Sequence, residues 1–396
     1  MRNIVIYLDH INRYHFFRRL SDALELLDYQ PIFLTCRLSL YIRLRFCGKY
    51  ALLIFKNEKN KVQKNIKSLD IFKGQQTISD ASGVYFSVYS VLDEINAKSA
   101  IDMFCIWNGS STCDLAISDF ARQNFVKTLY FEIGNFPNKI FVDPKGVNAR
   151  SWLYKNPKFL DNLPLDCRKF EKWEKNIFET QKSKQPPQIK FLAKVNWFSL
   201  VDRLGFYFFG VQRLDRASLY EQCWKIIRRR SVCLNYDSCD LKLPYVFLPL
   251  QVSDDSQLLF NSDVDNEQAI SLAKEQADLM KMPLVVKHHP VESSSSFLKK
   301  LDQLRSELGF ILVSQNTIEL IDHSSLLVVI NSTVGIEGIV RGKSVKVLGK
   351  AIYEKFDKKR VISYLQQYLL DYDFFDVNGP MSTSVAKKCL ERAEYL

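Results

Sequence analysis

Short apolar runs alternate with amphipathic helical patterns along the first third of the chain. The runs predicted as strands are residues 4–8, 31–35, 101–107 and 126–131. Helices are expected between them, at 16–27 and 115–124, where apolar residues recur with a helical period. Strands that alternate with helices are typical of a parallel sheet covered by helices. The pattern therefore predicts an α/β domain at the amino-terminal end.

The last third of the chain repeats this alternation. The predicted strands are residues 245–250, 284–287, 310–313, 326–330 and 345–348, and the predicted helices are 267–280 and 333–341. A chain of 396 residues is too long for a single hydrophobic core. We therefore expect two α/β domains, each built on its own sheet.

The region between these parts is basic and aromatic. Its basic residues are Arg168, Lys169, Lys172, Lys175, Lys182, Lys184, Lys190, Lys225, Arg228, Arg229 and Arg230. The dipeptide Pro186-Pro187 interrupts any helix there and is the strongest linker signal in the chain. We expect an N-terminal domain, a basic aromatic bridge and a C-terminal domain, whose last helices either stay in that domain or cross back to the first. The expected ranges are 1–165, 166–240 and 241–396.

Composition narrows the class of protein and its partners. With 47% apolar and 25% charged residues, the chain is a packed globular protein. The net charge of +11 indicates an anionic partner, which could be a nucleic acid, a membrane surface or a phosphorylated substrate. The nine cysteines form no CxxC pair, which excludes a zinc knuckle and a thioredoxin-type motif.

The sequence also predicts where in the cell the protein is located. The amino terminus lacks the long apolar segment of a secretory signal, and the odd number of cysteines suggests reduced thiols. The aromatic run 197–211 is interrupted by Asp202 and Arg203 and is too short to span a bilayer. A cytoplasmic protein with at most peripheral membrane contact is therefore expected.

The first candidate site follows the predicted strand 245–250. Residues 251–257 emerge at the carboxyl end of a parallel sheet, where ligands bind in open α/β folds. The adjacent Asp254 and Asp255 could offer a nucleophile or a base. A solvated loop whose aspartate caps the next helix is the alternative, and the spacing favours neither.

Two further polar segments also follow strands. In Lys287-His288-His289-Pro290, a histidine could donate to a phosphate or protonate a leaving oxygen. A metal site is the alternative, but no third ligand lies near the two histidines in the sequence. One of the two histidines is expected to be structural. In 331–335, backbone amides and two hydroxyls could cradle a phosphate, with an ordinary helix N-cap as the alternative. Glu337 could face the same ligand and accept ribose hydroxyls.

In the N-terminal domain, Glu132 ends a predicted strand and precedes a Gly-Asn turn at Gly134. Asn148 follows in a second glycine-containing turn, 146–149. A carboxylate at this place could act on an acceptor hydroxyl. A simple turn residue at a strand end is the alternative, and periodicity does not distinguish the two.

Together these segments resemble the capsule-polysaccharide β-Kdo transferases, a family that transfers 3-deoxy-octulosonic acid (Kdo). The matching stretches are 131–134 with 146–148, 250–252 with 255–257, 287–290, and 330–333 through 342–349. Their order and spacing fit from about residue 130 to 355. The family often has two acidic residues before the glycine corresponding to Gly134, whereas Ile133 occupies the second position here. Glu132 alone would therefore carry any role of that pair.

The resemblance implies a GT-B-like fold, with two Rossmann-like domains facing each other across a cleft. It implies that the C-terminal domain binds CMP-Kdo through Gln251, Ser256, Lys287, His288, His289, Pro290, Asn331, Ser332, Thr333 and Glu337. The implied catalytic residues are Asp255, Glu132 and His289, with Asp255 forming a covalent Kdo intermediate and configuration retained. Gly134 and Asn148 would lie on the acceptor side. No cofactor or metal is needed, because CMP leaves as a monophosphate.

The implied partners are CMP-Kdo, a (lyso)phosphatidylglycerol-type lipid or Kdo-glycolipid acceptor, the inner face of the cytoplasmic membrane and other capsule assembly or export proteins. Transfer to another glycan, such as an O-antigen, is the alternative within the same class. A basic nucleic-acid-binding protein is the alternative from a different class. The chain has no zinc motif, RNP-like strand or recognisable helix-turn-helix, so no nucleic-acid partner is expected.

Overall fold

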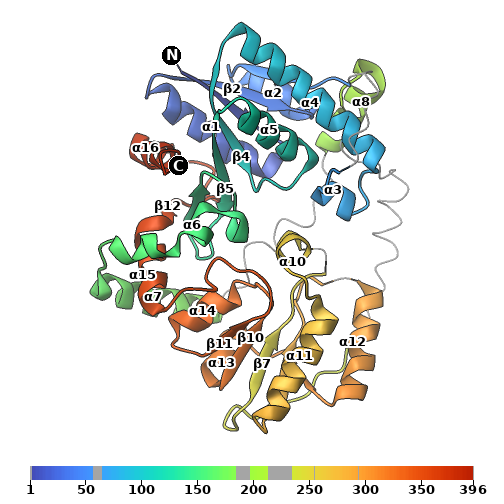
Figure 1. The fold of residues 1–396 in the computed structure, drawn as a ribbon, viewed down its shortest axis with the longest axis vertical. Coiled ribbons are helices and arrows are strands. Elements are labelled where there is room, and N and C mark those ends of the chain that lie inside the picture. The colour runs from blue at the N-terminus through green and yellow to red at the C-terminus, as the bar shows by residue number, and fades with distance from the viewer. Residues whose placement is uncertain are drawn as a thin grey trace. The chain divides into compact units, whose positions relative to one another are not determined.

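The computed structural model describes residues 2–56, 65–183, 197–212, 234–253, 255–292 and 294–395. These residues divide into two compact units (Figure 1). The first contains the described parts of 1–152, 194–217 and 369–396. The second contains those of 153–193 and 218–368. The expected linker at Pro186-Pro187, the basic residues Lys184, Lys190, Lys225, Arg228, Arg229 and Arg230, and the candidate Asp254 lie outside the described residues.

The first unit is built on a seven-stranded sheet with the order β12-β6-β5-β4-β1-β2-β3. The strands are β1 (Arg2–Tyr7), β2 (Tyr29–Thr35), β3 (Ala51–Leu53), β4 (Ile101–Trp107), β5 (Lys127–Ile133), β6 (Lys139–Asp143) and β12 (Leu370–Asp371). The strands from β3 to β5 are parallel, whereas β6 runs antiparallel to both β5 and β12. The central strands are continuous apolar runs because helices cover the sheet.

The helices of this unit are α1 (Ile11–Glu25), α2 (Leu38–Phe46), α3 (Leu69–Phe72), α4 (Ile78–Lys98), α5 (Thr112–Gln123), α8 (Trp197–Phe209) and α16 (Thr383–Arg392), with the short η1 (Asn148–Arg150). Capping boxes at Thr77 and Ser111 begin α4 and α5. Phe16 and Phe17 of α1 pack edge-on against Trp107 and Phe131 in the core. The first helix is expected at 16–27 but begins at Ile11, because the side chain of His10 caps it.

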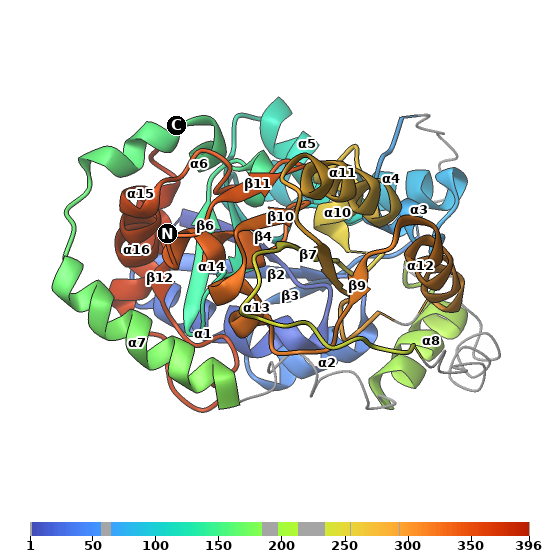
Figure 2. The same cartoon turned by 90° about the horizontal axis from the view of Figure 1, so that it is seen from below.

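The second unit has a five-stranded parallel sheet with the order β11-β10-β7-β8-β9. Its strands are β7 (Val246–Pro249), β8 (Leu284–Lys287), β9 (Ile311–Leu312), β10 (Leu326–Val329) and β11 (Val345–Val347). Figure 2 shows β11, β10, β7 and β9 in that order across the unit. Core residues such as Val246, Val286 and Val328 are fully buried.

The helices of the second unit are α7 (Cys167–Ser183), α10 (Ser256–Asn261), α11 (Asn266–Leu279), α12 (Ser295–Leu308), α13 (Thr317–His323), α14 (Val334–Val340), α15 (Lys358–Ser363), the 3-10 helix η2 (Pro157–Asn162) and the π-helical turn η4 (Tyr364–Tyr368). The short α6 (Trp152–Lys155) begins where the chain leaves the first unit. Helix α11 packs on β7 and β8, and α14 packs on β10 and β11.

These observations confirm the predicted fold class of two α/β units built on mainly parallel sheets. The region expected as one bridge is divided, since α7 belongs to the second unit and α8 to the first. After η4 the chain returns to the first unit, where β12 and α16 complete its sheet and its helical layer. No helix in the described part of the chain is both long and apolar enough to cross a membrane.

Candidate functional site

Three polar loops meet at one edge of the second sheet. Strands β10, β7 and β8 are neighbours and run parallel, so the residues that follow them emerge at the same edge. These loops contain Gln251 and Asp255 after β7, His288 and His289 after β8, and Asn331 after β10. The strand order therefore brings together candidate residues that lie up to 80 positions apart in sequence.

Gln251 and Asn331 bind each other. The Gln251 Nε2 donates to Asn331 Oδ1 at 2.9 Å, and the Asn331 backbone N–H donates back to Gln251 Oε1 at 3.0 Å. The Asn331 Nδ2 also donates to the backbone oxygen of Gln257 at 2.8 Å. Both side chains are buried, and their hydrogen bonds join the β7 and β10 loops to α10. The structure thus gives them a positioning role, while direct contact with a donor stays a prediction.

Glu292 is a site residue that the sequence analysis missed. Its Oε2 accepts hydrogen bonds from the backbone N–H of Ser253 at 2.8 Å and from the Ser253 hydroxyl at 2.7 Å. Its Oε1 accepts from the Ser294 backbone N–H at 2.7 Å. The buried carboxylate therefore ties the loop that carries Asp255 to the loop that carries His289. An isolated glutamate in a Ser-rich stretch gives no sequence signal of this role.

Asp255 and His289 lie within electrostatic reach of each other. The Asp255 carboxylate accepts from the backbone N–H of Gln257 at 2.7 Å and so caps α10. The His289 Nδ1 accepts from the backbone N–H of Val291 at 3.2 Å, so the neutral ring carries its proton on Nε2. Burial lowers the pKa of His289, while the negative charges of Asp255 and Glu292 act in the opposite direction. His289 is therefore a neutral hydrogen-bond donor at neutral pH.

The other members of the Lys-His-His-Pro segment have different surroundings. The Lys287 Nζ donates to the backbone oxygen of Gln315 at 2.6 Å and to the Thr317 hydroxyl at 2.9 Å. The His288 ring stacks on Tyr236, with centroids 5.7 Å apart. Pro290 is exposed in the following turn. Lys287 is thus hydrogen-bonded to other residues of the protein, and His288 is stacked on an aromatic ring.

The segment after β10 begins α14. The Ser332 hydroxyl accepts from the backbone N–H of Val334 at 3.3 Å, and the Ser332 carbonyl accepts from the Tyr353 hydroxyl. Thr333 is exposed, whereas Gly335 has no room for a side chain because a Cβ would collide with the Tyr353 ring. The N-cap residue Thr333 makes no side-chain hydrogen bond to the helix, so the ordinary N-cap that the sequence analysis weighed against a phosphate cradle is not formed, and the cradle stays a prediction.

Two donor-site candidates flank these loops. Ser256 is the first residue of α10 and is partly buried. Burial raises the pKa of Glu337 in α14 to about 7, and the positive charge of Arg341 acts in the opposite direction. A carboxyl group with this pKa exchanges its proton near neutral pH.

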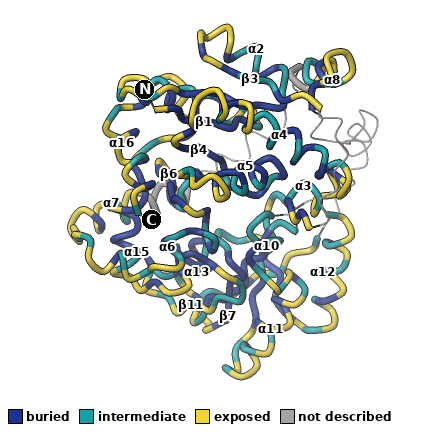
Figure 3. The backbone as a smooth tube through the Cα atoms, turned by 45° about the horizontal axis from the view of Figure 1, so that its top comes forward, coloured by how far each residue is buried: buried dark blue, intermediate teal, exposed yellow. Residues whose placement is uncertain are grey.

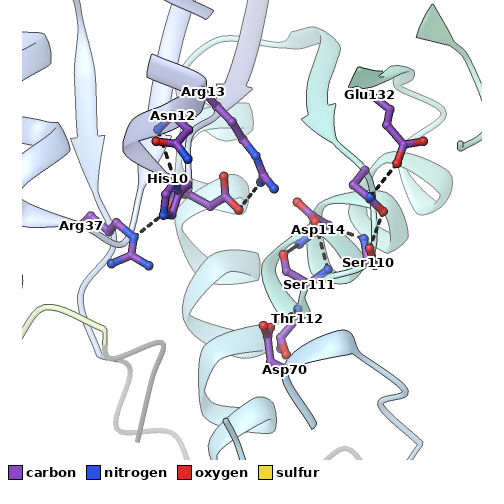
Figure 4. A network of polar contacts seen from close by, with 12 residues as sticks. His10, Asn12, Arg13, Arg37, Asp70, Ser110, Ser111, Thr112, Asp114 and Glu132 are labelled. Carbon is purple, nitrogen blue, oxygen red and sulfur yellow. Dashed lines mark hydrogen bonds and ion pairs between the residues drawn. The ribbon is translucent and has the colours of Figure 1, made fainter. Parts of the chain in front are cut away.

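In the first unit, Glu132 lies at the end of β5 (Figure 4). Its Oε1 accepts from Asn108 Nδ2 at 3.2 Å and its Oε2 accepts from Asn148 Nδ2 at 2.7 Å. Glu132 and Asn148 are therefore in direct contact, while their roles toward an acceptor stay predictions. Gly134 instead forms the tight connection from β5 to β6, where a Cβ would lie 2.8 Å from the Cβ of Lys139.

A second polar cluster at the strand ends of the first unit was also missed (Figure 4). Asp9 follows β1 and pairs with Arg13, and the Asp9 carbonyl accepts from Arg37. Asp114 accepts from the backbone N–H groups of Ser110 and Ser111, at 3.2 and 3.0 Å. Burial and the charge of Asp9 raise the pKa of Asp114 to about 7. The acidic residue and histidine directly after the first strand were the available sequence signal.

Within the described ranges, no group of three or more His, Cys, Asp and Glu side chains is placed to hold a metal ion. Asp9 and Asp114 each have one buried carboxylate oxygen without a hydrogen-bond partner.

Comparison with known proteins gives matches to proteins of capsule polysaccharide synthesis and export. The chain is 27% identical over 265 residues to the capsule polysaccharide export protein KpsS of Escherichia coli, covering 59% of this chain and 64% of that protein. It is 25% identical over 264 residues to the capsule polysaccharide modification protein LipB of Neisseria meningitidis serogroup A, covering 59% of this chain and 60% of that protein. The chain therefore spans under two thirds of the length of both relatives.

Among solved structures, the β-Kdo 2,7 transferase of Thermosulfurimonas dismutans KpsC aligns with 99% of this chain and 100% of that chain, at 13% identity and a TM-score of 0.44. The family model described as "Capsule polysaccharide biosynthesis protein" matches residues 104–356. That range is more than half of the chain, and it includes Glu132, Asn148 and the three loops of the second unit. The resemblance noted from the sequence is thereby confirmed, and the chain belongs to the capsule polysaccharide biosynthesis protein family.

Proposed function

We propose that this chain is a retaining glycosyltransferase that moves Kdo from CMP-Kdo to an acceptor used in capsule polysaccharide synthesis. The observation that carries the proposal is that Glu292 joins the loop of Asp255 to the loop of His289 by hydrogen bonds, at the carboxyl edge of a parallel sheet. Membership of the capsule polysaccharide family supports the choice of pathway. The choice of Kdo as the sugar rests on the sequence motifs through which the chain resembles the β-Kdo transferases.

In the proposed first step, the Asp255 carboxylate attacks the anomeric carbon of Kdo while the bond from that carbon to the CMP phosphate oxygen breaks. The electron pair of the broken bond leaves with CMP, and the His289 Nε2–H donates a hydrogen bond to the departing phosphate. A covalent Kdo–Asp255 intermediate results. Glu292 fixes both loops, so the carboxylate and the imidazole approach the donor together.

In the second step, an acceptor hydroxyl attacks the same carbon and releases Asp255. Glu132 takes the hydroxyl proton, and Asn148 and Asn108 orient the Glu132 carboxylate. Two successive inversions retain the configuration of the sugar. This assignment requires the two units to face each other across a cleft during the reaction, which is the GT-B-like arrangement that we propose.

The proposed acceptor is a (lyso)phosphatidylglycerol-type lipid or a Kdo-glycolipid, presented at the inner face of the cytoplasmic membrane. Other capsule assembly or export proteins would receive the product. The mechanism uses no metal, because CMP carries a single phosphate that hydrogen-bond donors can stabilise. Adding EDTA is therefore expected to leave the transfer rate unchanged.

The test is incubation with freshly generated CMP-Kdo and either fluorescent phosphatidylglycerol or a Kdo-terminated glycolipid, followed by mass spectrometry. A mass increase of one Kdo on the bare lipid would establish an initiating transferase. Addition only to the Kdo-terminated acceptor would establish an extending one. Replacing CMP-Kdo with a CMP-sialic acid controls for donor identity. No product with either acceptor would contradict the proposed donor and acceptor classes.

A further inference from the structure

Helix α8 is fixed to the first unit along one face. The Asp202 Oδ1 accepts from the Ser39 backbone N–H at 2.8 Å, and its Oδ2 pairs with Arg37 at 3.2 Å. Gly205 lies so close to α2 that a Cβ would be 2.9 Å from the Cβ of Leu38. These contacts hold α8 on α2, and much of the rest of the helix is exposed (Figure 3).

That outer face is apolar. Leu200, Leu204, Tyr207 and Phe208 follow the i, i+4, i+7, i+8 spacing of one helical stripe. The exposed fractions are 50% for Leu204, 67% for Tyr207 and 75% for Phe208. In a globular protein such a stripe normally faces a core. Here it faces outward, which marks an interaction surface.

The apolar surface continues past the end of α8. The chain at 210–212 pairs with 54–56, since the Lys56 backbone N–H donates to the Gly210 carbonyl at 2.9 Å and Gln212 N–H donates to Ile54 at 2.9 Å. This pairing puts Phe55, 53% exposed, and the exposed Lys56 next to the helix end. We call Leu200, Leu204, Tyr207, Phe208, Phe209 and Phe55 the α8 surface.

The two chain segments that form the α8 surface and the helix beneath it are basic in sequence. Segments 37–56 and 197–212 contain one acidic residue, Asp202, and six basic ones: Arg37, Arg43, Arg45, Lys49, Lys56 and Arg203. Asp202 pairs with Arg37, and Asp22 and Glu25 pair with Lys49. The two segments together with these partners have three more basic than acidic residues. Two copies of this surface would repel each other, whereas an anionic bilayer would attract it.

We infer that the α8 surface docks the protein on an anionic lipid bilayer, with α8 lying in the interfacial plane. At 13 residues the helix is about 20 Å long and is too short to cross the hydrocarbon core of about 30 Å. Tyr207, Phe208 and Phe209 supply the amphipathic and apolar rings that bury in the interface, and basic residues contact the headgroups. This inference deepens the proposed function and rests on it, because it names the surface that would bring the enzyme to a lipid acceptor.

The test measures vesicle binding by the full chain without any sugar donor. Sedimentation would use phosphatidylcholine vesicles, alone or with phosphatidylglycerol, at low and high salt. We expect binding only to the anionic vesicles, weakened by salt, and reduced about tenfold or more in Tyr207→Ser/Phe208→Ser. The matched control is Phe125→Ser, which removes an aromatic ring that is 95% exposed in the same unit and is expected to bind as wild type. Tyr207→Trp/Phe208→Trp should restore binding.

Wild-type binding in the folded serine variant would overturn the inference, as would equal binding to neutral vesicles. A wild-type dimer that the serine variant abolishes, without vesicle binding, would also overturn it in favour of a second copy. Kdo transfer to a water-soluble acceptor tests the proposed function separately. If the wild-type protein binds anionic vesicles through the α8 surface but transfers no Kdo, the docking surface is supported and the proposed activity is contradicted.

Discussion

Asp255 combines a structural contact with its proposed chemistry. Its carboxylate accepts from the Gln257 backbone N–H, which satisfies one free donor at the start of α10. The sequence left a capping residue and a nucleophile as alternatives. The structure shows the cap, and a substitution that keeps the cap while removing the nucleophile separates the two roles.

Asp255→Asn is expected to lower Kdo transfer by about a thousandfold or more, because an amide caps a helix well but does not form the covalent intermediate. Thermal unfolding should be nearly unchanged. Asp265→Asn is the matched control, since Asp265 is the N-cap of α11, is exposed and has no proposed chemistry. Initial rates with CMP-Kdo check the prediction, and near wild-type activity in a folded Asp255→Asn protein would remove Asp255 as the nucleophile.

Glu292 acts on the reaction through other residues in our proposal. In Glu292→Gln, the side-chain NH₂ group does not accept a hydrogen bond, so either the Ser253 or the Ser294 contact is lost. We expect kcat to fall about tenfold, with a smaller change in the donor KM, because the loop of Asp255 moves relative to His289.

The Glu292→Gln change also removes a negative charge that favours the protonated imidazole of His289. The pKa of His289 should therefore fall further below its usual value, which an NMR titration of the ring would detect. An unchanged His289 titration together with unchanged kcat would show that Glu292 does not position the site.

At the scale of elements, the connection between β5 and β6 explains a residue that the sequence placed on the acceptor side. The Gly134 backbone N–H donates to the Lys139 carbonyl at 2.8 Å, and the two chains are in van der Waals contact there. The glycine is thus required by the tight hairpin that holds Glu132 at its base. A direct role in acceptor binding stays a prediction.

Gly134→Ala is expected to destabilise the protein by about 1–3 kcal/mol, because the new methyl group meets the Lys139 backbone and Cβ. Gly83→Ala in α4 is the control, since a Cβ there meets nothing within 4 Å. The control change should stabilise the helix by roughly 0.5–1 kcal/mol. Urea denaturation checks both, and a neutral Gly134→Ala protein with weaker acceptor binding would instead favour the acceptor role.

Helix α14 contains a second testable feature, the carboxyl group of Glu337. Burial raises its pKa from 4.5 to about 7, so the folded protein binds this proton more tightly than the unfolded chain does. The stabilisation is present below pH 4.5 and is lost as the pH rises towards 7. Between about pH 5 and 8, wild type should lose about 2–3 kcal/mol more stability than Glu337→Gln. Unfolding at both pH values checks this, and Glu319→Gln, at an exposed carboxylate, should behave like wild type.

At the scale of the whole molecule, the chain leaves the first unit at α6 and returns after η4. Strand β12 then pairs antiparallel with β6, and α16 packs on α1, β5 and β6. The first unit therefore depends on residues from both ends of the chain, whereas the sheet of the second unit is built from one continuous portion, 246–347.

Removal of residues 369–396 should therefore loosen the first unit and spare the second. Hydrogen exchange of β6 amides is expected to become about tenfold faster or more, because β12 no longer pairs with that strand. Amides of β7 should keep their protection. Equal loss of protection in both strands would show that the two units do not unfold separately.

Local sequence patterns were sufficient to predict many of the strands and helices. The predicted strand 101–107 coincides with β4, and 245–250 contains β7, because long apolar runs bounded by polar residues form buried strands in most contexts. Helix α4 was not predicted, and neither were β6 and β12. The pairing of β12 with β6 joins residues about 230 positions apart, and no local pattern encodes such a contact.

The sequence by itself determined the two α/β units, the polar loops at the strand ends and the family. Each of these depends on residues close together in the chain, whose spacing and chemistry are readable directly. Only the tertiary structure decided that Gln251 and Asn331 bind each other, that Glu292 joins two loops, and that α8 turns an apolar stripe outward. These features depend on strand order and on which helix face meets a neighbour, and both are set by packing across the whole unit.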